Sequence, residues 1–110
     1  MGTEEDVPMH IVMVLYPHPD DPEAFKKYYE ETHIPLAAQL PGLRSYSVGY
    51  PQALGPDASP YFCVFRAEFD DAAAMQASFQ SEIGQKVAAD VPNYSPKGAT
   101  MIHFPEVGRG

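Results

Sequence analysis

The residues of this chain best suited to proton chemistry are its 4 histidines. His33 falls at helical spacing from Phe25 and Tyr29, so its ring should point with theirs toward the interior of the fold. An imidazole with its ordinary pKa of about 6.5 both accepts and donates a proton near neutral pH. We therefore predict that His33 is a catalytic acid or base, and the alternative is a hydrogen-bonded histidine of the core.

His10 is the second predicted catalytic residue, with the task of orienting a substrate. The strand residues from Tyr16 back to His10 span ~20 Å, and the helical residues from Pro22 to His33 span ~16 Å. Because the helix should run back antiparallel to the strand, the two histidines should meet at one end of the subunit and at the same cavity. The alternative for His10 is a strand-end residue half exposed to water.

The other two histidines give weaker signals. His103 falls on the last predicted strand, whose end should lie beside the start of the first, so it could neighbour His10. Two histidines without a firmly placed carboxylate make a poor metal site, because transition-metal sites usually have three or more protein ligands. His18 lies between two prolines and should be a solvated turn residue. We therefore expect no metal.

Aromatic and small apolar side chains should form a cavity behind the histidines. Buried tyrosines need a partner for their hydroxyl, so tyrosines at the cavity suit a flat organic molecule that carries a carbonyl, phenol or carboxylate. Cys63, the only cysteine, should be a small apolar wall residue and not a nucleophile. The predicted ligand-binding residues are Tyr28, Tyr46, Phe25, Val12, Val14, Cys63, Phe65, Phe79 and Ile83. The alternative is that most of them are simply core.

Composition excludes several classes of function. The net charge of -8 disfavours nucleic acid and anionic lipid surfaces as partners. No apolar run approaches the ~20 residues that span a bilayer, and the acidic start lacks the features of a secretory signal, so we expect a cytoplasmic protein. No phosphate loop, dinucleotide fingerprint or Ser-His-Asp signature occurs. No cofactor is demanded.

The elements that must position these residues follow from periodicity and from capping residues. Residues 1–8 should be an acidic tail, 9–104 one domain, and 105–110 a C-terminal tail. Strands are predicted over 9–16, 43–50, 61–69 and 97–104. One helix begins at Pro22, bends or ends near Pro35 and continues to Leu40; another begins after Asp70 or Asp71, restarts at Ser81 and ends at Pro92. The β-α-β-β-α-β order predicts an α+β, ferredoxin-like fold: a four-stranded antiparallel sheet with both helices on one face.

The second face of that sheet should also be apolar, which argues for a partner. Its predicted large side chains are Met9, Ile11, Met13, Leu15, Phe62, Val64, Ile102 and Phe104. If these side chains were exposed to solvent, they would form an apolar patch larger than monomers usually expose. We therefore expect a homodimer whose sheets pack face to face, and the alternative is that loops or the N-terminal tail cover this face.

The segment 51–60 is predicted to be a mobile loop that could act as a lid. It holds three prolines and a glycine, and it is far longer than the two to five residues of an ordinary hairpin connection.

Several stretches of the chain resemble the EthD family, within the dimeric α+β barrel superfamily. They are 29–36 (YEETHIPL), 41–43 (PGL), 81–85 (SEIGQ) and 89–94 (ADVPNY), and the resemblance runs from about Met9 to Phe104. It implies two ferredoxin-like subunits, each with a small-molecule cavity between sheet and helices. The family is named after a protein associated with degradation of ethyl tert-butyl ether, and the superfamily includes polyketide cyclases, a muconolactone methylisomerase and cofactor-free monooxygenases.

Some of these cyclases are similar to this chain in having a first-strand histidine that matches His10 and a helix tyrosine that matches Tyr28. They also use a second-helix histidine where this chain has Gly84, which is a departure from their pattern. Two functions therefore stay open. One is cofactor-free acid-base catalysis on a small, mostly apolar compound, by isomerisation, cyclisation, dehydration or decarboxylation. The other is non-catalytic binding of such a compound beside an oxygenase in a degradation pathway.

Overall fold

The computed structural model describes residues 8–110, so the predicted N-terminal tail lies almost wholly outside the described residues. The elements follow in the predicted order. They are β1 (His10–Tyr16), α1 (Pro22–Tyr28), η2 (Tyr29–His33), α2 (Ile34–Ala37), β2 (Ser45–Gly49), β3 (Cys63–Phe69), α3 (Ala72–Gln80), α4 (Glu82–Tyr94) and β4 (Thr100–Pro105). None of the helices within residues 8–110 has the length and apolar character needed to cross a bilayer.

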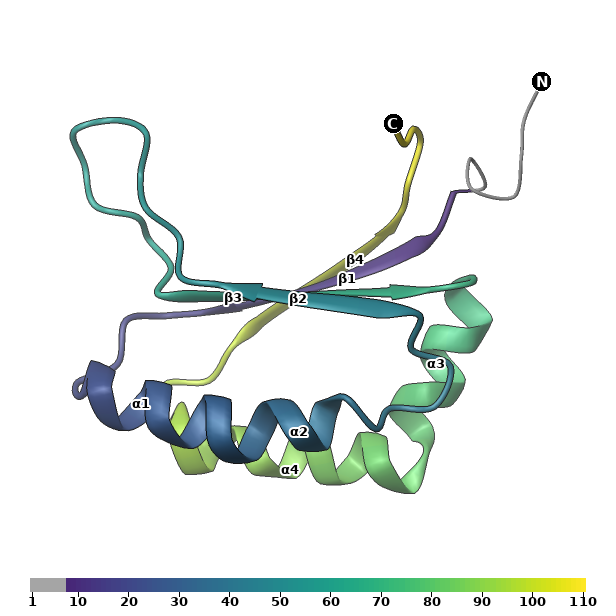
Figure 1. Ribbon diagram of the computed structural model, residues 1–110, viewed down its shortest axis with the longest axis horizontal. Coiled ribbons are helices and arrows are strands. Elements are labelled where there is room, and N and C mark those ends of the chain that lie inside the picture. The colour runs from purple at the N-terminus through teal and green to yellow at the C-terminus, as the bar shows by residue number, and fades with distance from the viewer. Residues whose placement is uncertain (1–7) are drawn as a thin grey trace.

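The four strands form one antiparallel sheet in the order β2-β3-β1-β4. All helices lie against the same face of this sheet, and the opposite face carries no helix (Figure 1). The α+β, ferredoxin-like fold predicted from the sequence is therefore confirmed.

The first helical run continues through the predicted break at Pro35 by changing its pitch. Asp21 accepts a hydrogen bond from the Ala24 amide, and Pro22 occupies the first turn, where its missing N–H costs nothing. The segment η2 is a π-helical turn in which the Ile34 amide bonds the Tyr29 carbonyl. The wider turn leaves room for the Pro35 ring where an α-helical carbonyl would crowd it. His33 is the last residue of this turn.

The second helical run consists of two capped helices in series. Asp71 caps α3 and Ser81 caps α4, which confirms the predicted restart at Ser81. The predicted end at Pro92 is wrong, because α4 continues to Tyr94 and closes with a hydrogen bond from the Ser95 amide to the Val91 carbonyl. Burial of the Tyr94 ring offsets the hydrogen bond that Pro92 cannot make.

Four aromatic rings of the core join the sheet to both helical runs. Tyr16 comes from β1, Phe25 from α1, Tyr29 from η2 and Tyr94 from α4, and each is buried. Every pair among these four rings has its centroids between 5.2 and 5.6 Å apart. Aromatic pairs at this spacing attract beyond the burial of their area. We call these residues the aromatic cluster.

The outer face of the sheet is apolar along β1 and β4 but charged along part of β3. Ile102 and Phe104 keep 45% and 39% of their surface exposed. Glu68 is buried between Arg66 and Arg109, so the C-terminal residues lie against this face and not apart from it. The sequence prediction for Phe62 is wrong, because its ring packs edge-on against Phe25 on the helical side, 5.1 Å between centroids.

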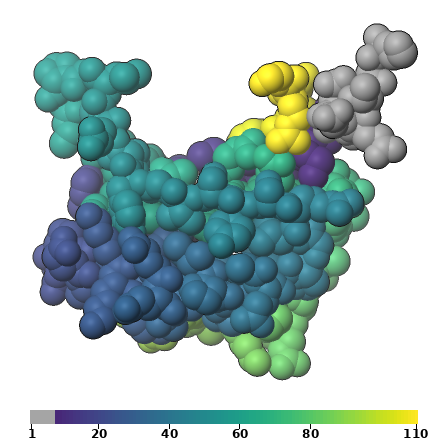
Figure 2. Space-filling view, viewed as in Figure 1, coloured from purple at the N-terminus to yellow at the C-terminus, as the bar shows by residue number. Residues whose placement is uncertain are grey.

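The connection between β2 and β3 has no regular structure from Tyr50 to Phe62, and its residue Leu54 is fully exposed. It stands clear of the body on the sheet side opposite the helices (Figures 1 and 2). In this position the loop does not cover a cavity between the sheet and the helices of the same subunit, and its role as a lid stays a prediction. Its mobility stays a prediction.

Gly84 offers a test of how the two helices of the second run fit together. A Cβ atom at this position would overlap the backbone carbonyls of Ser78 and Phe79. We expect Gly84→Ala to lower the free energy of unfolding by about 1–3 kcal/mol, as overpacking does. Urea denaturation followed by circular dichroism measures this. Gly49→Ala is the control, because a Cβ there meets nothing within 4 Å; equal effects of the two variants would contradict the packing argument.

Candidate functional site

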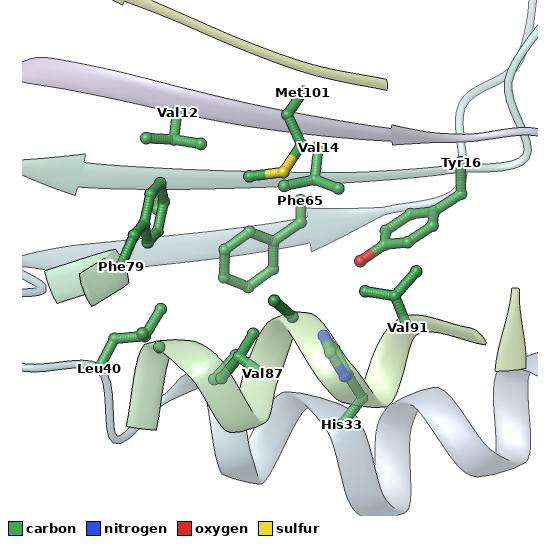
Figure 3. A pocket seen from close by; sticks show the side chains of 14 residues that line it. Val12, Val14, Tyr16, His33, Leu40, Phe65, Phe79, Val87, Val91 and Met101 are labelled. Atoms are coloured by element: carbon green, nitrogen blue, oxygen red, sulfur yellow. The ribbon is translucent and has the colours of Figure 1, made fainter. Parts of the chain in front are cut away.

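A cavity of about 250 Å³ lies between the inner face of the sheet and the helices (Figure 3). It is lined by Val12, Val14, Tyr16, His33, Ala37, Leu40, Phe65, Ala67, Phe79, Gly84, Val87, Ala88, Val91 and Met101. Met101 is 56% exposed and Ala88 is also exposed, so the mouth lies between α4 and the edge strand β4. The size and the apolar walls suit a small organic molecule.

His33 is the one titratable imidazole in this lining, and it is 3% exposed. Its ring stacks on Tyr29 at 5.4 Å and contacts Tyr94 at 4.5 Å between centroids. Figure 3 shows the ring rising from the helix toward the sheet, at the end of the cavity that Tyr16 and Val91 also line. The aromatic cluster therefore fixes the direction in which the imidazole points.

Asp90 on α4 holds the other side of this ring. Nδ1 of His33 lies 2.9 Å from Oδ2 of Asp90. Oδ1 of Asp90 accepts two further hydrogen bonds, from the Tyr28 hydroxyl at 2.6 Å and from Nδ2 of Asn93 at 3.0 Å. Nε2 of His33 makes no hydrogen bond to any residue in the range 8–110. The ring is thus anchored through one nitrogen, and the second is left for a ligand.

Burial and hydrogen bonding set the charges of this pair. Burial lowers the pKa of His33, and the bond to Asp90 offsets only part of that effect. Burial alone would raise the pKa of Asp90, but the hydrogen bonds from Tyr28, Asn93 and His33 outweigh it, so the pKa is lowered. Near neutral pH the site therefore holds a neutral imidazole beside a carboxylate.

Tyrosine hydroxyls form the polar part of the same end of the cavity. The hydroxyls of Tyr16 and Tyr94 lie 2.7 Å apart and share a hydrogen bond. Burial raises the pKa of Tyr16, Tyr29 and Tyr94, so all three stay protonated. Tyr16 lines the cavity, and its hydroxyl can donate to a ligand when Tyr94 donates to Tyr16.

Some of the predicted ligand-binding residues lie elsewhere. Val12, Val14, Phe65 and Phe79 line the cavity as expected. Phe25 and Tyr28 instead line a separate depression beside Asn93 and Lys97, because the π-helical turn brings His33 and not Tyr28 to the cavity. Tyr46 stacks on Phe65 with 42% of its surface exposed, and Ile83 packs on the core. Cys63 is fully buried, and burial raises the pKa of its thiol to about 12.

The prediction that His10 and His33 share a cavity is wrong. The helix starts beyond the end of β1, so Phe25 and Tyr29 lie against Tyr16. His33 is then only ~6 Å farther along the helix from Tyr29, whereas His10 is ~20 Å along the strand from Tyr16. His10 does not line the cavity.

His10 instead pairs with His103, as the strand order suggested. Nε2 of His10 lies 2.9 Å from Nδ1 of His103 across β1 and β4. Within residues 8–110 no three histidine, cysteine, aspartate or glutamate side chains are grouped to hold a metal ion. The two histidines therefore remain a hydrogen-bonded pair at the edge of the sheet.

Sequence reasoning missed Asp90, Tyr16 and Met101. Asp90 lies three residues after Val87 and one before Val91, at the border of the apolar stripe of α4. A carboxylate at the border of a buried helical face indicates a polar contact at that place, because a partly buried carboxylate needs a hydrogen-bond donor. Met101 shares its strand face with His103, but a methionine at this position carries no chemical signal of a site.

The chain is similar to known proteins over most of its length. The EthD domain family model matches residues 17–98. An uncharacterized 11.0 kDa protein in the thcB-thcC intergenic region of Rhodococcus erythropolis is 33% identical over 98 residues, which cover 89% of this chain and 95% of that protein. An ethyl tert-butyl ether d (EthD) family protein of Bacillus halodurans superimposes with a TM-score of 0.85 at 26% identity, covering 90% of this chain and 99% of the other.

A dimeric ferredoxin-like protein of unknown function from Thermobifida fusca is also similar. It has a TM-score of 0.67 at 18% identity and covers 90% of this chain and 92% of its own. At this identity the likeness concerns the fold alone.

The lowered pKa of His33 predicts how stability depends on pH. The unfolded chain takes up a proton at the ordinary value of 6.5, but the folded chain resists it, so the free energy of unfolding should fall as the pH drops below about 6.5. The lowered pKa of Asp90 acts only below its ordinary value of 3.8. Urea denaturation between pH 7.5 and 5 should show a flatter profile for His33→Gln than for the wild type. The control His18→Gln removes an exposed histidine and should keep the wild-type slope; parallel profiles for all three proteins would contradict the assignment.

Proposed function

The chain belongs to the EthD family, and on this basis we propose that it binds a small, mostly apolar organic molecule and moves a proton on it without a cofactor. The observation that carries the proposal is an imidazole, held by a carboxylate, in the lining of an apolar cavity. A general base works best when its pKa lies near the operating pH and its free nitrogen faces the substrate. His33 meets the second condition, because Asp90 occupies Nδ1 and the ring lines the cavity.

The chemistry follows from the geometry of the pair. Nε2 of His33 removes a proton from a C–H or O–H group of the substrate, and the ring becomes an imidazolium whose Nδ1–H bonds the Asp90 carboxylate. The Tyr16 hydroxyl donates to an oxygen that gains charge. Return of the proton from the imidazolium to another carbon completes an isomerisation. Loss of a β-hydroxyl group from the same anion, with the imidazolium proton passing to the departing oxygen, completes a dehydration and releases water.

Non-catalytic binding is the second candidate, and one observation favours it. Apart from His33 and the Tyr16 hydroxyl the cavity walls are apolar, which is sufficient to hold a hydrophobic metabolite without changing it. Such a protein would capture or deliver a compound beside an oxygenase, in a degradation pathway of the ethyl tert-butyl ether type.

Turnover separates the two candidates. We expect the protein to speed exchange of the α-protons of 2-indanone and 2-tetralone with D₂O, measured by proton NMR. His33→Gln should lower this rate by about 10²-fold or more while binding persists. Binding without exchange above the buffer rate would exclude catalysis on these ring ketones and support the binder.

A matched pair of variants tests where 2-indanone and 2-tetralone bind. Ala88→Phe should block the mouth and abolish binding, whereas Ala89→Phe places the same ring at the adjacent exposed position outside the cavity lining. Binding that survives Ala88→Phe unchanged would contradict the cavity assignment.

We further propose that two copies pair through the outer faces of their sheets, as a dimeric α+β barrel. The support is the exposed apolar surface of β4 beside half-buried Met13 and Val64, continuous across three strands. Burial of this patch is favourable at about 25 cal/mol per Å².

The pairing should bury upward of ~1,200 Å² in total, as stable interfaces do. Sedimentation should then show a dimer at micromolar concentration. Met13→Glu should split the dimer or unfold it, because it buries a further carboxylate opposite Arg66, whose guanidinium already pairs with Glu68 and Glu106. Gln76→Glu adds the same charge on the helical side and should leave the dimer intact; a wild-type monomer would refute the pairing.

A further inference from the structure

The hydrogen bonds around Asp90 fix which nitrogen of His33 carries the proton. A carboxylate only accepts, so Nδ1 of His33 must donate to Oδ2 of Asp90. Oδ1 is occupied by two other donors, Tyr28 and Asn93. In the neutral ring the remaining nitrogen, Nε2, then has a lone pair and no hydrogen, and it faces the cavity as an acceptor.

We propose that Asp90 is the positioning residue that makes His33 an acceptor toward the cavity, so that the site selects neutral ring compounds bearing a hydrogen-bond donor. Phenols, enols and similar hydroxyl compounds fit this description. Compounds of equal size with only acceptor oxygens make no bond to Nε2 and should bind more weakly. The inference rests on the proposed function, because it names the ligand class of the same cavity.

Charge argues for the same ligand class. No lysine or arginine of residues 8–110 lines the cavity, so a carboxylate would enter without a counter-ion. The groups that face His33 are Tyr29 from η2, Asp90 and Tyr94 from α4, and Tyr16 from β1. The tyrosines stay protonated and Asp90 is negative, so none of them supplies a positive charge. An anionic ligand would lose its hydration without replacement.

Asp90→Asn should invert the selectivity. Tyr28 and Asn93 both donate to Oδ1, so they hold the amide oxygen of the new residue at that position. Its NH₂ group then faces Nδ1 of His33 and donates to it. The ring must move its proton to Nε2, and the cavity presents a donor where the wild type presents an acceptor.

Binding and NMR test the proposal together. In the wild type, long-range ¹H–¹⁵N spectra at pH 7.5 should show His33 protonated at Nδ1, and 4-ethylbenzoate should not bind. The ratio of the Kd for 4-ethylanisole to the Kd for 4-ethylphenol should be about tenfold higher in the wild type than in Asp90→Asn. A tenfold change is the equivalent of one neutral hydrogen bond. Asp90→Asn should show His33 protonated at Nε2. Glu31→Gln, an exposed change of the same charge on η2, should match the wild type in both measurements.

Either of two results would overturn the proposal. One is a wild-type His33 protonated at Nε2, which needs no variant and is independent of how well Asp90→Asn folds. The other is an unchanged tautomer and an unchanged phenol-to-anisole ratio in folded Asp90→Asn. If none of the three probes binds at all, the proposed function fails and not only this assignment. If 4-ethylphenol and 4-ethylanisole bind equally well to the wild type, the cavity is a binding site but the proposed role of Asp90 is wrong.

Discussion

The aromatic cluster is the constraint on which the rest of the structure depends. Tyr16, Phe25, Tyr29 and Tyr94 come from β1, α1, η2 and α4, so their mutual packing fixes both helical runs against the sheet at one end. Each ring buries a large apolar area, and the pairs add about 0.5–1.5 kcal/mol each. The cavity begins where this packing stops. His33 lies on the border, stacked on Tyr29 and in tilted contact with Tyr94, and its direction is therefore set by the core and not by a loop.

That placement ties the stability of the fold to the chemistry of the site. A buried imidazole is easier to hold neutral than charged, and the fold accordingly lowers the pKa of His33. A buried polar ring also needs a partner, which Asp90 supplies. Asp90 in turn retains its charge because Tyr28 and Asn93 donate to it near the surface. The same contacts that satisfy His33 structurally leave Nε2 as a directed acceptor, so the core-histidine and catalytic interpretations describe one arrangement.

The sequence predicted the fold better than it predicted the site, for a physical reason. Apolar alternation, Asp and Ser caps and the positions of proline are local signals, and they placed every strand and both helical runs. The cavity depends on how far each helix slides along the sheet, which no local signal specifies. Hence Val12 and Phe65 were placed in the cavity correctly from strand alternation, whereas His10 was assigned to it wrongly from a length comparison. Asp90 belongs to a contact between distant helices, and its partner could be found only in three dimensions.

Gly84 shows how a shared fold can carry a different site. The sequence resemblance to superfamily cyclases suggested a second-helix histidine at this point, but α3 ends so close to α4 that a side chain would overlap the carbonyls of Ser78 and Phe79. A histidine could enter only if the helices moved apart. The missing group is thus excluded by packing, and the acid-base capacity of the cavity concentrates on the His33–Asp90 pair. Since function resides in such local sites and not in the fold, proton transfer here would have to be performed by one base with tyrosine hydroxyls.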